Sequence, residues 1–301
     1  MVDVVIIGSV AMDSIETPFG KVKEVLGGSA TYAAFAASFF CKPGIVAAVG
    51  DDFPQEYLNL LEKKGICLAG LKLKKGTRTF RWEGCYKFDM SEVKTLRTEL
   101  NVWETFKPQL PEEYRKVQYL FLGNIDPELQ LNVLAQMESP KFVMADTMNF
   151  WIEHKRKELE KVIRKIDLLL LNDGEARELF ETTNLTKAAR QALKLGPKAV
   201  VIKKGEHGAV LFSGSGHFSA PGYPLENIVD PTGCGDSFGG GLSGYLAKTG
   251  DLSDGNMRKA IIYGSVIASH NAEGFGLDNL KKISLSDIEG RYYEFRRIGE
   301  F

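Results

Sequence analysis

Short apolar runs alternate with amphipathic segments along this chain, and this alternation predicts its fold. The first run, Val2–Ile7, is rich in β-branched residues and ends at Gly8, as expected of a buried strand. From about residue 118 the alternation is regular, with strands predicted at Tyr119–Leu122, Phe142–Ala145, Leu168–Leu171 and Ala199–Ile202. Helices are predicted between them, over 127–138, 152–165, 173–181 and 186–195. Such alternation is typical of βαβ units, in which helices cover a mostly parallel sheet.

The rest of the chain completes an α/β pattern. Other predicted elements are a hairpin over 10–26, a helix over Ser29–Phe40, a strand over Ile45–Val49, a helix over 54–64, a polar β segment over Leu71–Asp89, a hairpin formed by Ala209–Phe212 and His217–Ala220, and helices starting near 236 and 257. No repeat, low-complexity tract or linker divides these elements, so we expect a single domain over residues 1–301.

Composition narrows the classes of function. The net charge is −1 and 44% of the residues are hydrophobic, which gives no basic surplus for nucleic acid or an anionic membrane. The four cysteines are far apart and the four histidines show no ligand spacing, as expected of reduced thiols without a zinc site. We find no signal-peptide pattern and no apolar run long enough for a membrane span, so a cytoplasmic protein is expected.

The segment Asp230-Pro-Thr-Gly-Cys-Gly-Asp236 carries the strongest chemical signal. Glycines at a helix start let unpaired amides approach a phosphoryl group, and the helix dipole favours the anion there. Asp236 is then placed to take a proton from an attacking hydroxyl. Taken alone, the segment is better described as a glycine-rich turn with an aspartate N-cap, and only the other motifs around it favour the phosphoryl site.

Three common nucleotide-binding motifs are missing. The chain contains no Gly-x-x-x-x-Gly-Lys-[Ser/Thr] and no kinase His-Arg-Asp set, and its first strand ends in Gly8-Ser-Val-Ala-Met-Asp13 instead of Gly-x-Gly-x-x-Gly. A nucleotide phosphate site therefore has to come from elsewhere, and residues 230–241 are the best candidate.

The segment Asp230–Phe238 resembles the C-terminal signature of the ribokinase-like (PfkB) carbohydrate kinase family, Asp-Thr-x-Gly-Ala-Gly-Asp-x-Phe. The resemblance implies a three-layer αβα sandwich with a mostly parallel central sheet and a small β-lid, formed by residues 10–26 and about 71–104. It also implies that Asp236 is the general base and that the amides of Gly233, Cys234 and Gly235 form an anion hole.

On the acceptor side, Gly27-Gly28 resembles the family's substrate-binding turn, and Asp13 matches the acid that holds substrate hydroxyls. Asp126 follows a strand and is expected to line the same pocket. Sugar-binding members often carry asparagines where this chain has Ala11 and, approximately, Tyr32. An aromatic residue there favours a nucleoside or another ring-bearing acceptor over free ribose, although helix packing accounts for Tyr32 equally well.

On the nucleotide side, Asn172-x-x-Glu175 matches the motif that the family associates with Mg²⁺, through water, and with the phosphates. Its spacing is also that of a capping box. Lys203-Lys204-Gly205-x-x-Gly208 matches the nucleotide loop, with two lysines replacing the usual Thr-Leu; Lys203 either reaches the ATP phosphates or is a solvated charge. The remaining nucleotide positions implied are Thr232, Gly264, Asn271 and Gly274, and some members bind a monovalent cation near Asp230 and Thr232.

The resulting prediction is an ATP-dependent kinase that phosphorylates an alcohol of a sugar or nucleoside. Two other classes compete: a non-catalytic ligand-binding or regulatory protein of this fold, and a dinucleotide oxidoreductase, which the absent glycine fingerprint disfavours. The cationic lid residues, such as Arg81, either bind an anionic acceptor or belong to an exposed sheet face. By resemblance, the lid also forms a homodimer contact.

Overall fold

A large sheet and a small sheet organise the molecule, which is represented by a computed structural model that describes residues 1–90 and 93–300. The large sheet has nine strands in the order β13-β12-β11-β10-β9-β8-β1-β4-β5. Its strands are β1 Val4–Ile7, β4 Pro43–Gly50, β5 Cys67–Lys74, β8 Tyr119–Leu122, β9 Phe142–Ala145, β10 Leu168–Asn172, β11 Ala199–Lys203, β12 Ala209–Ser213 and β13 Gly216–Ala220. Neighbouring strands from β5 to β11 are parallel, whereas the β11–β12 and β12–β13 pairs are antiparallel.

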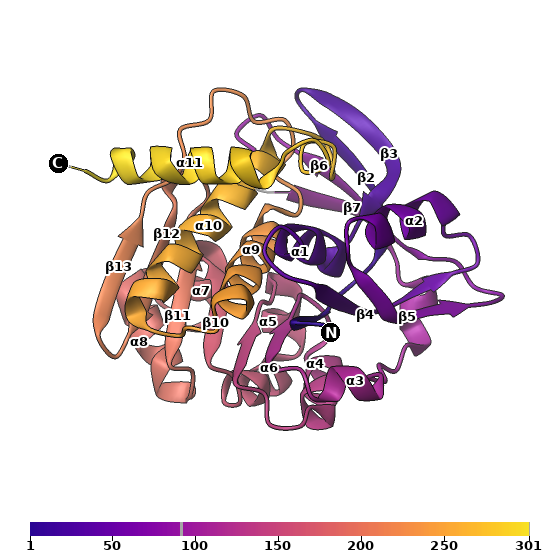
Figure 1. Cartoon of the computed structure of the whole chain (residues 1–301), viewed down its shortest axis with the longest axis horizontal. Helices are drawn as coiled ribbons and strands as arrows, with labels where there is room; N and C mark the ends of the chain where they lie inside the picture. Colours follow the sequence, from indigo (N-terminus) through magenta and orange to yellow (C-terminus); the bar gives the residue numbers. More distant parts are fainter. Residues whose placement is uncertain (91–92, 301) are drawn as a thin grey trace.

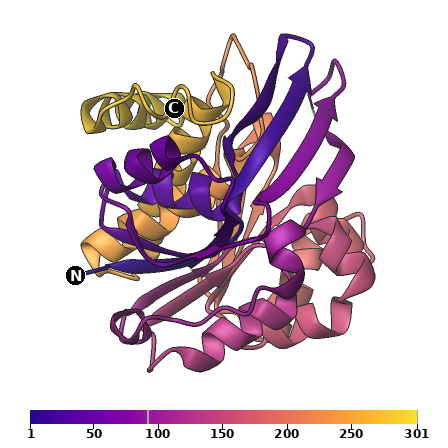
Figure 2. The ribbon, with the colours of Figure 1, turned by 90° about the vertical axis from the view of Figure 1, so that its right-hand side faces the viewer.

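Helices cover both faces of the large sheet (Figures 1 and 2). One face carries α1 Ser29–Ala37, α2 Gln55–Lys63, α9 Cys234–Thr249, α10 Asp254–Ala272 and α11 Leu285–Ile298. The other carries α3 Glu112–Arg115, α4 Pro127–Gln136, α5 Asn149–His154, α6 Arg156–Ile163, α7 Asp173–Leu179 and α8 Leu185–Leu195. The short 3₁₀ helices are η1 Asn101–Thr105 and η2 Gly205–His207. The predicted three-layer αβα arrangement is confirmed.

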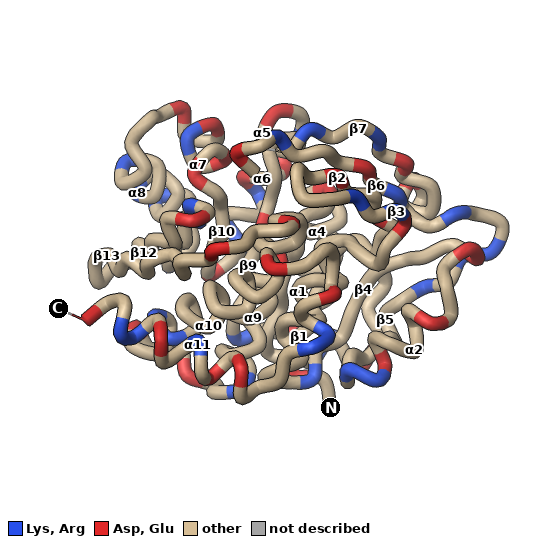
Figure 3. Tube along the Cα trace, turned by 90° about the horizontal axis from the view of Figure 1, so that it is seen from above, with Lys and Arg blue, Asp and Glu red and all other residues tan. Residues whose placement is uncertain are grey.

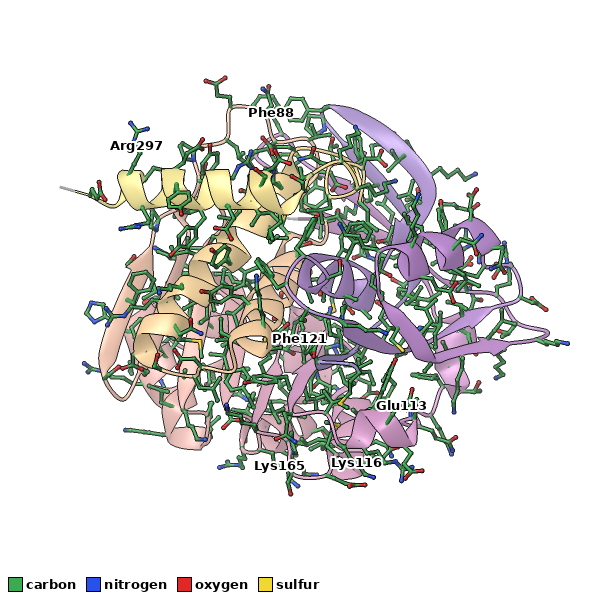
Figure 4. The ribbon with its side chains drawn as sticks, in the orientation of Figure 1. Phe88, Glu113, Lys116, Phe121, Lys165 and Arg297 are labelled. Carbon is green, nitrogen blue, oxygen red and sulfur yellow. The ribbon has the colours of Figure 1, made fainter. Side chains whose placement is uncertain are left out.

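The apolar strands are buried on both sides, which explains why they are continuous apolar runs. In β1, Val4 and Ile6 pack into the core under α1 and α9, whereas Val5 and Ile7 pack into the opposite core. Figure 4 shows Phe121 of β8 deep inside the molecule, while the charged side chains of Lys165 and Arg297 lie at its periphery. Side chains alternate between the faces of a strand, so each strand contributes to both cores.

The small sheet stands at one edge of the large one (Figure 2). It contains β2 Ala11–Thr17, β3 Gly20–Gly27, β6 Phe80–Tyr86 and β7 Val93–Glu99, in the order β3-β2-β6-β7. The second expected lid segment, 71–104, is divided between the two sheets: its residues up to Lys74 belong to β5 of the large sheet, whereas β6 and β7 lie in the small one. Residues 91–92 of that segment lie outside the described residues.

Some boundaries differ from the sequence-based expectation for local reasons. The single helix expected over 152–165 is two helices, α5 and α6, which meet at Lys155. Helix α10 starts at Asp254, earlier than expected, because Ser253 caps it by accepting a hydrogen bond from Asn256 N. Helix α11 was not predicted; its start is a capping box between Ser284 and Asp287.

A run of glycines allows two helices of the core to approach closely. A methyl carbon placed on Gly240 of α9 would lie 2.1 Å from the Ala33 carbonyl oxygen of α1, and one on Gly239 would lie 2.5 Å from the Phe121 ring. Gly244 faces Ala37 in the same way, at 2.7 Å. The run 239–241 is therefore a packing feature within α9.

The distribution of charged residues agrees with the nearly neutral net charge of the chain. Lys and Arg are interspersed with Asp and Glu along the chain (Figure 3). Within the described residues, no helix has both the length and the apolar character needed to cross a bilayer.

Candidate functional site

Four charged side chains from distant segments meet at the carboxyl edge of the large sheet. Asp146 follows β9, Glu175 lies in the first turn of α7 after β10, and Lys203 ends β11. Because these strands are parallel neighbours, their carboxyl ends lie side by side. Asp236, in the first turn of α9, interacts electrostatically with Asp146 and Lys203. The predicted phosphoryl segment therefore faces the strand ends that carry charge.

Residues 230–235, called the glycine loop below, lead into α9. Gly233 is the N-cap of α9 with φ 74°, a left-handed conformation that favours glycine. Cys234 N–H donates to the Pro231 carbonyl oxygen at 3.1 Å, so one of the three expected anion-hole amides already has a partner. Gly235 lies in the first helical turn, where amides lack a partner in a preceding turn. Burial raises the pKa of the Cys234 thiol to about 12, so it is neutral near pH 7.

Asp236 is held in an environment that disfavours its charged form. Its pKa is raised to about 7, mainly by burial and also by nearby Asp146, while the Lys203 ammonium opposes the shift. A carboxyl with a pKa near the working pH suits a general base, because it is partly ionised yet accepts a proton readily.

Lys203 forms a buried ion pair with Asp146. The Lys203 Nζ lies 2.6 Å from Asp146 Oδ2, and the two side chains are 16% and 5% exposed. A methyl carbon on Gly235 would lie 3.2 Å from the same Nζ. The ammonium therefore sits beside the first turn of α9, and the interpretation of Lys203 as a solvated charge is wrong.

Asp13 comes from the small sheet and faces the same loop. It accepts a hydrogen bond from Gly28 N at 3.2 Å and is 4% exposed. A methyl carbon on Gly27 would lie 1.8 Å from Asp13 Oδ2, so only glycine fits there. The pKa of Asp13 is raised to about 7, mainly by burial and also by Asp230 and Asp236, while the Gly28 hydrogen bond opposes the increase. Two acids far apart in the sequence, Asp13 and Asp236, thus come close enough to interact electrostatically.

Tyr32 has a different position from the one expected of an acceptor-facing aromatic ring. It is 1% exposed, and a methyl carbon on Gly233 would lie 2.4 Å from its ring carbon Cγ. The ring packs beneath the glycine loop, and its buried hydroxyl has no hydrogen-bond partner among the described residues. The structure supports the packing interpretation and gives no exposed aromatic face at this residue.

The Asn172–Glu175 motif forms the capping box that its spacing predicts. Asn172 Oδ1 accepts from Glu175 N, and Glu175 Oε2 accepts from Asn172 N, both at 2.7 Å. Burial raises the pKa of Glu175 to about 8; Lys203 opposes this shift and Asp146 adds to it. The cap therefore fixes a buried carboxyl next to Lys203, and the structural and functional interpretations are compatible.

The loop before α9 is braced by hydrogen bonds from three directions. Asp230 accepts from Thr232 N at 2.9 Å and from Gly276 N at 3.1 Å. Asn271 Nδ2 donates to the Thr232 carbonyl oxygen at 2.8 Å. The oxygens of Asp230 and Thr232 that the resemblance links to a monovalent cation thus already have N–H partners. Asn271 is fully buried against this loop and braces it from behind.

The other predicted site residues are distributed more widely. Gly264 lies inside α10, where a methyl carbon would be 2.7 Å from the Phe238 carbonyl oxygen, so its close contact is with α9. Asp126 caps α4 through its Oδ1 atom, and its Oδ2 atom lies 2.7 Å from Lys155 Nζ, so both of its carboxylate oxygens have partners. Gly205 and Gly208 have positive φ in the loop after β11, and Gly274 follows α10. No contact tests their nucleotide roles, which stay predictions.

Sequence reasoning missed Tyr86 as a site residue. It ends β6 of the small sheet, and its hydroxyl lies 3.2 Å from the Thr232 Oγ1 atom. Burial raises the pKa of its phenol, and Asp230, Cys234 and Asp13 are among the neighbouring groups. Only the tertiary fold brings these segments together, because the hydrogen bond spans 146 residues. Asp146 follows the buried strand β9, and that position after an apolar run is a sequence signal for a site residue.

The electrostatic balance of the site suits Mg²⁺ bound together with phosphates. The single Lys203 ammonium interacts with three carboxyl groups, Asp146, Glu175 and Asp236, and the pKa values of the last two are raised. Among the described residues, no three His, Cys, Asp or Glu side chains converge as direct ligands. Mg²⁺ retains several waters and uses few protein carboxylates, so an acidic but sparse site fits it.

The fold and this site together define a small-molecule kinase with an α/β core. The model of the pfkB family carbohydrate kinases matches residues 1–282, and the chain belongs to this family. It is a carbohydrate or nucleoside kinase, so the enzyme prediction is confirmed over the non-catalytic and oxidoreductase alternatives.

Similar proteins include kinases for nucleosides. The chain is 31% identical to a cytidine kinase of Thermococcus kodakarensis, over 81% of this chain and 89% of that one. It is 26% identical to an adenosine kinase of Saccharomyces cerevisiae, over 77% of this chain and 74% of that one. A nucleoside kinase of Burkholderia thailandensis, solved with inosine, superposes with a TM-score of 0.79 at 20% identity, covering 97% of each chain, and supports the fold.

Proposed function

We propose that this enzyme transfers the γ-phosphoryl group of ATP to a hydroxyl group of a nucleoside. The observation that carries the proposal is that Asp13, which is 4% exposed, and Asp236, in the first turn of α9, lie close enough for the charge of Asp236 to act on Asp13. One acid orients the acceptor hydroxyl and the other takes its proton. The similarity to the Thermococcus cytidine kinase supports a nucleoside as the acceptor.

In this proposal each group has one task. Asp236 removes the proton of the acceptor hydroxyl as its oxygen attacks the γ-phosphorus, and Asp13 accepts a hydrogen bond from the acceptor. The first-turn amide of Gly235 and the positive end of α9 bind the phosphoryl oxygens. Phosphoryl transfer depends mostly on positioning and charge stabilisation, so such a sparse set suffices. Glu175 would hold Mg²⁺ through water, and the ion would supply neutralisation of phosphate charge.

The charges of the small sheet favour a neutral acceptor. Arg81 pairs with Asp52 at 2.7 Å and with Glu24 at 2.9 Å, so it is already engaged by two acids. Arg78 lies 3.7 Å from the same Asp52. The hypothesis that these arginines bind an anionic group of the substrate thus loses support, whereas a nucleoside carries no charge that would need them.

We expect a panel of acceptors to separate the substrate classes. With Mg²⁺-ATP, ADP production should be stimulated most by one or more nucleosides and at least about tenfold less by free sugars and sugar phosphates. The reason is that binding energy from the base adds to that from the ribose. Coupled ADP release measures the rate, and mass spectrometry identifies the product. A free hexose or a sugar phosphate as the best acceptor would contradict the proposal.

We further propose that the small sheet closes over the acceptor as a lid, with Tyr86 linking it to the glycine loop. Replacing Tyr86 with phenylalanine removes the hydrogen bond to Thr232 and should raise the KM of the acceptor by roughly 2- to 10-fold, the value of one net hydrogen bond. Thr95→Val is the control, since it removes a bond of similar length, from Trp82, inside the small sheet. Equal effects of the two substitutions on this KM would exclude a lid-specific role.

A further inference from the structure

The side chain of Lys203 is placed where the transferred group would lie. Its Nζ is within 3.2 Å of a methyl carbon built on Gly235, in the first turn of α9, and its charge acts on Asp236. The helix start and the ammonium therefore present positive charge to the same small volume. An anion bound there would contact both.

The ion pair with Asp146 uses only part of the hydrogen-bonding capacity of the Lys203 ammonium. An ammonium has three N–H groups, and within the described part of the chain the Nζ engages one acceptor, Asp146 Oδ2. Asp146 Oδ1 in turn accepts from Thr147 N at 3.0 Å, which holds the carboxylate in place. Breaking a buried ion pair leaves an uncompensated charge, which is costly. Asp146 therefore favours the charged form of Lys203 and fixes the position of its ammonium group.

Lys203 brings a positive charge to the carboxyl end of β11. A mostly buried ammonium stabilises a spread negative charge strongly in a site that excludes water. Lys203 therefore supplies a cation beside the first turn of α9.

We propose that Lys203 is a catalytic residue that contacts the transferring γ-phosphoryl group, and that Asp146 is its positioning residue. This inference rests on the proposed function. The acceptor oxygen bonds to the γ-phosphorus while the bond to the bridging oxygen of ADP breaks, and the hydroxyl proton moves to Asp236. Lys203 keeps its own proton throughout and stabilises charge on the equatorial phosphoryl oxygens, which is greatest in the transition state.

The test compares Lys203→Met and Asp146→Asn with Lys198→Met. Lys198 precedes the same strand and pairs with Asp167 at 2.7 Å, but is 81% exposed. We expect Lys203→Met to lower kcat by about 10²- to 10³-fold with less than about fivefold change in the KM of ATP, and Lys198→Met to leave both unchanged. Asp146→Asn should lower kcat less, and the double variant should be no slower than Lys203→Met.

Two further measurements separate a catalytic from a structural role. The acid limb of kcat/KM should move to higher pH in Lys203→Met, because Asp236 loses a neighbouring positive charge. ADP with fluoroaluminate, an anion that mimics the phosphoryl group in transfer, should bind Lys203→Met at least about tenfold more weakly than wild type, while ADP alone binds equally. That binding requires no acceptor, so it tests Lys203 even if the proposed nucleoside is wrong. Wild-type turnover in Lys203→Met, or a loss confined to the KM of ATP, would overturn the inference.

Discussion

Replacing Asp236 with asparagine is expected to lower kcat by a factor of about 10² to 10⁴ while the protein remains folded. Asparagine fills the same space but cannot accept the proton of the acceptor hydroxyl. Wild-type kcat/KM should fall as pH drops through about 7, since burial raises the pKa values of Asp236 and Asp13 to about 7 and protonation removes the base. Steady-state rates between pH 5 and 9 measure both effects.

Lowering the pH, which should reduce kcat/KM, should increase the stability of the folded protein. The folded-state pKa of Asp236 is about 7, above its unfolded value near 4, so ionisation in the folded protein costs stability as pH rises through 7. The melting temperature of Asp236→Asn should therefore match or exceed that of wild type at pH 8, with a smaller advantage at pH 5. Asp254→Asn, in the first turn of α10, is the matched control and should retain wild-type kcat. A kcat of Asp236→Asn within about threefold of wild type would rule out the proposed base.

Replacing Gly240 with alanine is expected to lower the free energy of unfolding by about 1 to 3 kcal/mol or more. The added methyl carbon would lie 2.1 Å from the carbonyl oxygen and 2.6 Å from the Cα atom of Ala33. Both atoms belong to the backbone of α1, so the clash is relieved only by moving one helix away from the other. Because α1 begins at the Gly28 turn and carries Tyr32, the displacement should also reduce activity.

The control for this prediction is Gly290→Ala in α11, where an added methyl carbon meets nothing within 4 Å. Alanine has the higher helix propensity, so this substitution should raise the free energy of unfolding by up to about 1 kcal/mol. Urea-induced unfolding followed by circular dichroism compares the two variants with wild type. If Gly240→Ala is as stable as Gly290→Ala, the close packing of α1 on α9 is not what requires glycine there.

Local pattern was sufficient for most of the fold. Strands β8 and β9 have the predicted boundaries, because an apolar run ending at polar residues marks where a buried strand leaves the core. The break at Lys155 was missed because α5 and α6 read as one charged helical segment. Helix α11 was missed because much of its length is exposed and amphipathic only in part.

The candidate site was predictable where its chemistry lies within a few residues of sequence. The Asn172–Glu175 box and the loop from Gly233 to Asp236 are local structures, so spacing alone indicated their geometry. Tyr32 could not be placed in this way. Its orientation depends on the Gly233 backbone 201 positions along the chain, which covers the ring face.

The sequence by itself therefore determined the α/β alternation and the glycine-rich start of α9 that can bind a phosphoryl group, since both depend on the periodicity and conformational freedom of neighbouring residues. Only the tertiary structure decided that Lys203 pairs with Asp146, that Tyr86 reaches Thr232 and that Asp13 lies within electrostatic range of Asp236. These contacts join segments far apart in the sequence, and parallel strand order and the docking of the small sheet bring them together. The sequence likewise does not show what glycines 239–241 do, because they allow close packing against elements that are distant in the chain.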